Sequence, residues 1–347
     1  MRAHTFYAPL AGGRNREVVR RRQNLCRGAV RVTAPVQLSS LNLGDQLAEG
    51  GQGAVHELLD QPELVFKRYL YPDSPAFRPD ALQRLVDCRA SIAFSGRSVD
   101  EFAAWPTAVV NDGTRTVGFL MRRVPTGFTL AIGGKVLLAD LSYLATEPKP
   151  IWGDVDLPGM SEKVQVLQHL AGAVDAFHAR QIVVGDISYA NVLWSREPQP
   201  RVMLIDCDGM RHAGMESVLP QADTPDWEDP MPPAGYAPGP DQDRYKLALA
   251  VRRVLTSSLD ARLTSSSPDL SEVGGAGPKL EALLARAAGP AGTRPSAREW
   301  FDALSGRATQ PVRQGERREI DAPGARPDLL TSSTSERKFR PVTPPGS

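Results

Sequence analysis

Short apolar segments separated by turn sequences dominate the chain from Val36 to Val124. Each segment is rich in Val, Leu or Phe, which is typical of β-strands. The predicted strands are 64–70, 105–110 and 116–124. The sequence Asn-Asp-Gly at 111–113 separates the last two strands as a turn. This part of the chain is therefore predicted to be mostly β.

A helical pattern interrupts these strands at 79–94. Apolar residues there recur every three or four positions, as they do on the buried face of an amphipathic helix. The predicted face carries Leu82, Leu85, Val86 and Arg89. We therefore expect one helix within the mostly β part.

After Pro125 the pattern becomes mainly helical. Apolar residues at helical spacing predict several helices, with Ser161 as the N-cap of the first. The predicted helices are 161–179, 243–255 and 296–304. Apolar runs at 182–184 and 201–206 flank a loop, and the segment 211–240, rich in Pro, Asp and Gly, is predicted to be a long ordered loop.

The two ends of the chain differ in composition from the rest. Residues 1–35 carry eight Arg and one acidic residue, and we interpret them as a basic, flexible extension. Residues 307–347 are rich in Pro and poor in apolar residues, which predicts a disordered tail. The segment 36–306 carries 25 basic and 34 acidic residues, a net charge of −9. Nucleic-acid binding needs clustered positive charge, so we expect no nucleic-acid partner.

The composition as a whole is that of a globular protein without a membrane span. Of the 347 residues, 41% are hydrophobic and 23% are charged, so the chain can bury a sizeable core. No run approaches the roughly 18 consecutive apolar residues of a transmembrane helix, and no apolar segment near Met1 suggests a signal peptide. The cysteines, Cys26, Cys88 and Cys207, are too scattered to suggest a zinc site or a disulfide framework. We therefore expect a cytoplasmic location.

Two features of the mostly β part are candidates for phosphate binding. The Gly-rich segment 47–55 would let backbone N–H groups approach an anion without Cβ obstruction, and a plain hairpin turn is the alternative. Lys67 is the only lysine among the first 134 residues. A lone ammonium among so many arginines indicates a site for a point charge, and a surface lysine at a strand end is the alternative.

Two loops in the mainly helical part carry carboxylates and an amide. Asp186 and Asn191 lie five residues apart, where they can serve as proton acceptor and metal ligand, or can form an Asx turn. Asp206 ends an apolar run, and Asp208 follows two residues later. Carboxylates at a strand end suit Mg²⁺, which prefers oxygen ligands. Asp208 could bind a second Mg²⁺ or cap the turn at Gly209.

The order and spacing of these four features resemble the protein kinase superfamily over residues 36–306. The resemblance implies an α+β, two-lobed protein-kinase-like fold, with a small β-rich N-lobe at 36–124 and a larger helical C-lobe at 125–306. It also implies ATP and Mg²⁺ as cofactors, bound between the lobes. The residues that the resemblance assigns are Ala48, Gly50, Gly51, Gly53, Val55, Lys67 and Met121 for the nucleotide, Asp186 and Lys67 for catalysis, and Asn191 and Asp206 for the metal.

Three features around the two carboxylate loops depart from the family pattern. Val184 and Gly185 stand where the family has His-Arg, and Ser188 stands where Ser/Thr kinases place a Lys. Asp208 replaces the Gly of the family's Asp-Phe-Gly. The same region, with "IDCDGM" and "TPDWEDP", is similar to a bacterial subgroup of eukaryotic-like Ser/Thr kinases related to those of tellurium-resistance clusters.

A fourth departure concerns the partner of Lys67. The family pairs this lysine with a Glu from the neighbouring helix, but residues 78–95 contain no Glu. Asp87 is the nearest substitute, and Glu101 lies beyond the predicted helix.

The resemblance implies a protein kinase that transfers the γ-phosphoryl group of ATP to Ser or Thr hydroxyls of protein substrates. A pseudokinase that binds nucleotide as a scaffold stays open, because the helix Glu is missing and Asp208 replaces the Gly. A small-molecule kinase also stays open, because "GDISYAN" is similar to the aminoglycoside and choline kinases.

We predict that the two ends are dispensable for folding and nucleotide binding, because few of their residues are apolar enough to join a core. A fragment comprising 36–306 should unfold cooperatively and bind ATP·Mg²⁺ with the affinity of the full chain. Thermal melts and calorimetric titrations of both proteins measure this. An insoluble or unfolded fragment would show that these boundaries are wrong.

Overall fold

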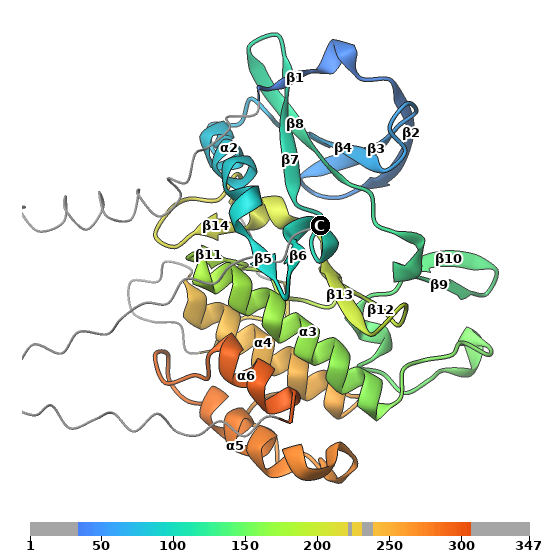
Figure 1. Cartoon of the computed structure of the whole chain (residues 1–347), viewed down its shortest axis with the longest axis vertical. Coiled ribbons are helices and arrows are strands. Elements are labelled where there is room, and N and C mark those ends of the chain that lie inside the picture. The colour runs from blue at the N-terminus through green and yellow to red at the C-terminus, as the bar shows by residue number, and fades with distance from the viewer. Residues whose placement is uncertain (1–33, 221–223, 231–238, 307–347) are drawn as a thin grey trace, which may run out of the picture. The chain divides into compact units, whose positions relative to one another are not determined.

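The alternating segments near the start of the described chain form a six-stranded sheet, drawn in blue to teal in Figure 1. The computed structural model describes residues 34–220, 224–230 and 239–306. The strand order is β1-β7-β8-β4-β3-β2. The bounds are Val36–Gln37 for β1, Leu43–Glu49 for β2, Gly53–Leu58 for β3, Leu64–Tyr69 for β4, Pro106–Asp112 for β7 and Arg115–Arg122 for β8. The strands predicted at 64–70, 105–110 and 116–124 are confirmed to within two residues.

Side-chain alternation along β4 places its apolar residues in two clusters, one on each face of the sheet. Phe66 is fully buried in a cluster with Leu58 and Val110, on one face of the sheet. Val65 and Tyr69 are buried on the other face, in the main core. Since successive side chains of a strand point to opposite faces, Lys67 lies on the same face as Val65 and Tyr69.

The helix predicted at 79–94 is shorter than expected. Helix α2 spans Pro79–Cys88, and its apolar face is buried as predicted. One 3₁₀ turn follows, and the chain then forms a short hairpin of β5 (Ala93–Phe94) and β6 (Arg97–Ser98). Ile92 is already extended, with φ of −98° and ψ of 117°, so the helix cannot continue to Phe94.

Four helices are the longest elements of the remaining described chain, drawn in green to red in Figure 1. Their bounds are Met160–Ala179 for α3, Pro240–Leu255 for α4, Gly277–Ala287 for α5 and Ala297–Leu304 for α6. The sequence pattern predicted three of them and missed α5. With the sheet, they give the mixed α+β fold that was predicted, with a β-rich N-terminal region and a helical C-terminal part. None of the described helices combines the length and apolarity that crossing a bilayer requires.

The predicted N-cap of the first long helix is wrong. Helix α3 begins at Met160, and its N-cap is Gly159 rather than Ser161. The backbone N–H of Gly159 donates to the carboxylate of Glu162 at 3.1 Å, so the glutamate satisfies a terminal donor.

Short strand pairs connect the helices. The apolar runs predicted at 182–184 and 201–206 form β11 (Ile182–Val183) and β13 (Arg201–Leu204). Four further short strands were not predicted as such. They are β12 (Val192–Ser195), which pairs with β13, β14 (Arg211–His212), which pairs with β11, and the hairpin of β9 (Thr129–Ile132) with β10 (Lys135–Leu138).

The long loop predicted at 211–240 is only partly described. Strand β14 opens it, and 224–230 form turns, whereas 221–223 and 231–238 lie outside the described residues. The expectations for 1–35 and 307–347 concern ranges that lie almost wholly outside them as well.

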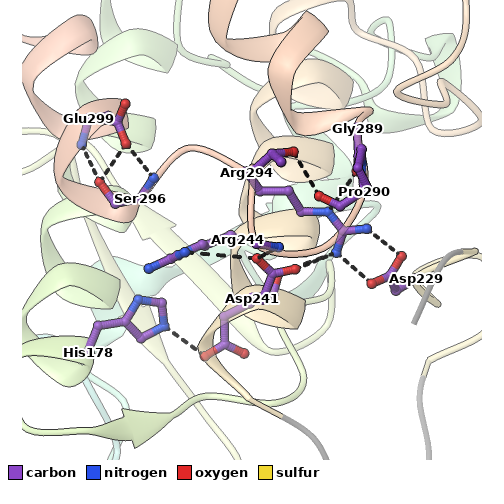
Figure 2. A network of polar contacts seen from close by, with 12 residues as sticks. His178, Asp229, Asp241, Arg244, Gly289, Pro290, Arg294, Ser296 and Glu299 are labelled. Atoms are coloured by element: carbon purple, nitrogen blue, oxygen red, sulfur yellow. Dashed lines mark hydrogen bonds and ion pairs between the residues drawn. The ribbon is translucent and has the colours of Figure 1, made fainter. Parts of the chain in front are cut away.

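A buried ion pair ties this loop to the chain that enters α6, and Figure 2 shows its network. The Arg294 side chain is fully buried, and its Nη2 donates to Asp229 Oδ1 at 2.8 Å. The same guanidinium reaches Asp241 Oδ2 at 3.1 Å, near the start of α4. The Arg294 fork therefore holds two separate segments against one another.

We expect Asp229→Asn to destabilise the protein by about 3 kcal/mol, because it leaves a buried guanidinium without its bidentate partner. Urea or thermal unfolding measures the loss. Glu216→Gln is the matched control, since Glu216 also pairs with an arginine, Arg78, but its side chain is 73% exposed. That control should cost less than about 1 kcal/mol. Equal losses in the two variants would contradict the importance of the buried pair.

Candidate functional site

Strand β4 positions Lys67 at the centre of the sheet. Its register places Lys67 opposite Val55 of β3 on one side and Phe119 of β8 on the other. Lys67 is only 5% exposed. Its ammonium donates to Asp208 Oδ1 at 2.7 Å and to Asp206 Oδ1 at 3.2 Å. The lysine that the sequence singled out is therefore a buried cation with two carboxylate partners, and not a surface residue.

The Gly-rich segment forms the turn between β2 and β3. The backbone N–H of Gly50 donates to the carbonyl of Gly53 at 2.9 Å, which closes the turn. A Cβ at Gly53 would lie 2.6 Å from the carbonyl oxygen of Arg68, so only glycine fits there. A Cβ at Gly50 or Gly51 would meet nothing within 4 Å. Packing thus requires the third glycine, whereas the first two leave the backbone of the turn open.

A cleft of about 610 Å³ lies beneath this turn. All ten residues that the family resemblance assigned to the site line it. They are Ala48, Gly50, Gly51, Gly53, Val55, Lys67, Met121, Asp186, Asn191 and Asp206. Their positions are up to 158 residues apart in sequence, from 48 to 206, so the fold brings together what the sequence only suggested.

Asp186 and Asn191 share one loop between β11 and β12. The Asn191 amide donates to Asp186 Oδ2 at 2.7 Å and to the Asp186 carbonyl at 3.2 Å. The hydroxyl of Thr224 donates to both carboxylate oxygens of Asp186, at 2.9 and 3.0 Å. These bonds fix the orientation of the Asp186 carboxylate where it lines the cleft.

Helix α4 holds the backbone of this loop from below. Asp243 is fully buried and accepts hydrogen bonds from the backbone N–H groups of Val184 and Gly185, both at 2.8 Å. It also lies 2.9 Å from His178 Nε2. Gly185 has φ of 82°, a conformation that favours glycine. The Val-Gly pair that departs from the family's His-Arg is therefore a buried pair of backbone donors to one carboxylate.

Lys246 of α4 is a second buried cation near Asp186. Its side chain is fully buried, its ammonium donates to the Gly185 carbonyl at 2.8 Å, and it lies 3.9 Å from Asp186 Oδ1. Ser188, where the family places a lysine, is buried, and its hydroxyl has no hydrogen-bond partner among the described residues. The positive charge beside Asp186 thus comes from a helix 60 residues later in the chain.

Asp206 and Asp208 both reach Lys67, but their side chains differ in exposure. Asp206 has φ of 54°, in the left-handed region, and Cys207–Gly209 then form a 3₁₀ turn. The Asp206 side chain is 60% exposed and lines the cleft, whereas that of Asp208 is 2% exposed and does not. An extended chain would have let both face the same way, so the turn decides which carboxylate meets the solvent.

Asp208 has a partner for each of its oxygens. Oδ1 accepts from Lys67, and Oδ2 accepts from the hydroxyl of Tyr69 at 3.1 Å. Burial alone would lower the pKa of Lys67, but the charges of Asp208 and Asp206 outweigh it and raise that pKa above its ordinary value. Burial and the charge of Asp208 also raise the pKa of Tyr69 well above its ordinary value. Both donors therefore keep their protons at neutral pH.

The substitutes proposed for the helix Glu have other partners. Asp87 accepts from the Gln83 amide at 2.8 Å, and Glu101 accepts from the Ser98 backbone N–H at 3.1 Å. The carboxylates that meet Lys67 come instead from the turn after β13.

Sequence reasoning missed several residues that hold the site: Tyr69, Thr224, Asp243 and Lys246. A signal for the last two was present in "DQDRYKLALA", where polar residues, among them one of the chain's seven lysines, run directly into an apolar helical stretch. Polar residues on a buried helix face require partners. For Tyr69 and Thr224 the sequence offers no comparable signal.

The oxygen donors of Asn191 and Asp206 fit a hard divalent cation. Both side chains line the cleft, and the Ile205 N–H donates to the Asn191 carbonyl at 3.0 Å, which brings the two segments together. Asn191 uses its amide nitrogen toward Asp186, so its side-chain oxygen is the donor left for a metal. One carboxylate and one amide oxygen, completed by water and phosphate oxygens, suit Mg²⁺.

The chain is similar in part to known protein kinases. No known family profile matches the chain. Over 175 residues the chain is 25% identical to a protein kinase, YegI, of Escherichia coli strain K12. The aligned segment covers 49% of this chain and 23% of YegI. It is also similar to the ROP18 kinase domain solved with AMP-PNP and sucrose, with 16% identity, a TM-score of 0.49, and 84% and 88% of the two chains covered. Both likenesses are to protein kinases, and the alignment with YegI spans less than a quarter of that protein's length.

We expect Asp206→Asn to abolish Mg²⁺-dependent binding of a non-hydrolysable ATP analogue, because it removes the only carboxylate of the proposed metal pair. Asp208→Asn should keep the Mg²⁺ dependence, because Asp208 does not line the cleft. Calorimetric titration with and without Mg²⁺ measures both. The opposite result, with Mg²⁺ dependence lost in Asp208→Asn and kept in Asp206→Asn, would move the metal site by two residues.

Proposed function

We propose that this protein is an ATP- and Mg²⁺-dependent protein kinase that transfers the γ-phosphoryl group to Ser or Thr hydroxyls of protein substrates in the cytoplasm. The observation that carries the proposal is the cleft, which gathers a buried lysine, a Gly-rich turn, an Asp-Asn loop and an exposed Asp. These four features can bind phosphates, hold a metal and accept a proton, and phosphoryl transfer needs little other chemistry from the protein.

Lys67 and the Gly-rich turn would hold the phosphates. The Lys67 side chain lines the cleft, and the raised pKa of Lys67 keeps its ammonium charged. The turn at Gly50 and Gly51 presents backbone without side chains, so N–H groups can approach phosphate oxygens closely. The apolar side chains of Val55 and Met121, which line the same cleft, would contact the base.

Asn191 and Asp206 would hold Mg²⁺ where they line the cleft. Bound there, Mg²⁺ would neutralise charge on the phosphates as the γ-phosphoryl group leaves. The turn at Cys207–Gly209 fixes Asp206, and the hydrogen bond to Asp186 fixes Asn191, so neither ligand needs to reorganise.

Asp186 would orient the acceptor hydroxyl and take its proton. Its carboxylate is held by Thr224 and Asn191 and lies 3.9 Å from the Lys246 ammonium. The nearby cation would stabilise the carboxylate before transfer, and the bonds would aim it into the cleft. Catalysis would come from positioning and charge neutralisation rather than from a covalent intermediate.

A nucleotide-binding scaffold without transfer activity is the second candidate. The observation that favours it is Ser188, a buried residue with a neutral hydroxyl where Ser/Thr kinases place a lysine. Lys246 supplies a cation from a different direction and is fully buried, so its contact with a γ-phosphate would require the loop to open. Measurement of phosphoryl transfer separates the two candidates.

Lys67→Met should lower phosphoryl transfer by about 10²- to 10³-fold while the fold is retained, because it removes a pre-positioned cation from the phosphates. The assay follows the labelled γ-phosphoryl group of ATP into a generic protein substrate with Mg²⁺, and analyses labelled Ser and Thr. Lys135→Met is the matched control, since Lys135 is exposed on β10. Activity of Lys67→Met within threefold of wild type would contradict the proposal. Tight ATP·Mg²⁺ binding without any transfer in the wild type would favour the scaffold.

A further inference from the structure

The partner of Lys67 is the point at which this chain departs most from its family. The family takes the partner carboxylate from the helix that packs on the sheet, but α2 has no Glu, and its Asp87 is bonded to Gln83. The shortest contact of the ammonium is with Asp208, at 2.7 Å, and the next is with Asp206, at 3.2 Å.

We propose that Asp208 is the positioning residue that holds the Lys67 ammonium in the cleft, in place of a carboxylate from helix α2. The pairing of Lys67 with Asp208 rests on the geometry alone. The role of this pair in catalysis rests on the proposed function.

The surroundings of Asp208 fit a dedicated structural anion. Its side chain is 2% exposed, and a buried carboxylate is costly unless it is paired and hydrogen-bonded. Lys67 and Tyr69 supply one donor to each oxygen. The two donors are two residues apart on β4, so both project from the same face of one strand. Asp208 is therefore held rigidly by the sheet that carries the lysine.

Asp206 cannot fill this role alone once a metal is bound. Its side chain is 60% exposed, and as the proposed metal ligand it would share its charge with Mg²⁺. Asp208 does not line the cleft, so no ligand in the cleft competes for it. The lysine thus keeps one full counter-charge throughout binding and transfer.

The pairing has a consequence for regulation. In the family arrangement, a movement of the helix that carries the Glu makes or breaks the ion pair. Here Asp208 lies within the turn Cys207–Gly209, and Asp206 directly precedes that turn. A movement of α2 would leave Lys67 paired, whereas a movement of this turn would displace the metal ligand and the lysine partner together.

A double-mutant cycle on the nucleotide-free protein tests the pairing without reference to activity. The variants are Lys67→Met, Asp208→Asn and the double variant, compared by thermal unfolding. Residues in direct contact are coupled, so the double variant should melt at least about 2 °C above the temperature that additive losses predict. The control cycle of Lys67→Met with Asp87→Asn should be additive. Additivity in the Asp208 cycle, or equal coupling in both cycles, would overturn the inference.

If Asp208→Asn does not fold alone, the cycle remains decisive. Loss of the carboxylate leaves a buried ammonium without its nearest counter-charge, and Lys67→Met removes that ammonium. The double variant should therefore fold where Asp208→Asn does not. If Lys67→Met folds and the double variant does not, the role of Asp208 is independent of Lys67 and the inference is wrong.

Kinetics of the folded variants separate this inference from the proposed function. Asp208→Asn should lower kcat at least tenfold and keep Mg²⁺-dependent binding of ATP, while Asp87→Asn keeps the wild-type kcat. An unchanged kcat in Asp208→Asn would overturn the positioning role. A wild-type protein without transfer activity would defeat the proposed function, and the unfolding cycle would still report on the pairing.

Discussion

The buried ammonium of Lys67 is the constraint around which the site is arranged. It comes from the middle of a sheet, it is nearly inaccessible to water, and its counter-charges come from a turn about 140 residues later in the chain. A cation in such a place is tolerated only with well-placed anions, because its desolvation costs several kcal/mol otherwise. The ion pairs therefore bind the turn after β13 to the sheet, and they bring the exposed Asp206 to the cleft at the same time.

A second buried charge supports the other side of the cleft in a comparable way. Asp243 of α4 accepts from two backbone N–H groups of the loop that carries Asp186, so a carboxylate fixes backbone rather than a side chain. Lys246, one turn along the same helix, donates to the carbonyl of that loop. Together the two residues satisfy a loop whose backbone groups would otherwise be buried without partners. The sheet thus supplies the cationic side of the cleft, and α4 supports the anionic side.

The sequence predicted the members of the cleft better than the connections between them. Lys67, Asp186 and Asp206 were identifiable because their spacing and their flanking apolar runs encode the strands that place them. The burial of Asp208 was not predictable, because it depends on a left-handed residue and a 3₁₀ turn that leave no hydrophobic period. The same limit applies to the end of α2, where a 3₁₀ turn and an extended Ile92 follow Cys88, and to α5, whose 11 residues follow a Gly-rich 3₁₀ segment. Partners such as Tyr69 and Asp243 are defined only by tertiary contact.

The central claim is that this cleft binds a metal–nucleotide complex, with the phosphates at the Lys67 ammonium and the metal at the Asn191–Asp206 pair. Crystallography of the protein with AMP-PNP and Mn²⁺ tests it most directly, because Mn²⁺ stands in for Mg²⁺ and can be located by its anomalous scattering. The account predicts an anomalous peak within bonding distance of Asp206 and of the side-chain oxygen of Asn191, with phosphate oxygens in contact with Lys67. A peak on Asp208, or a nucleotide bound outside the cleft, would contradict it.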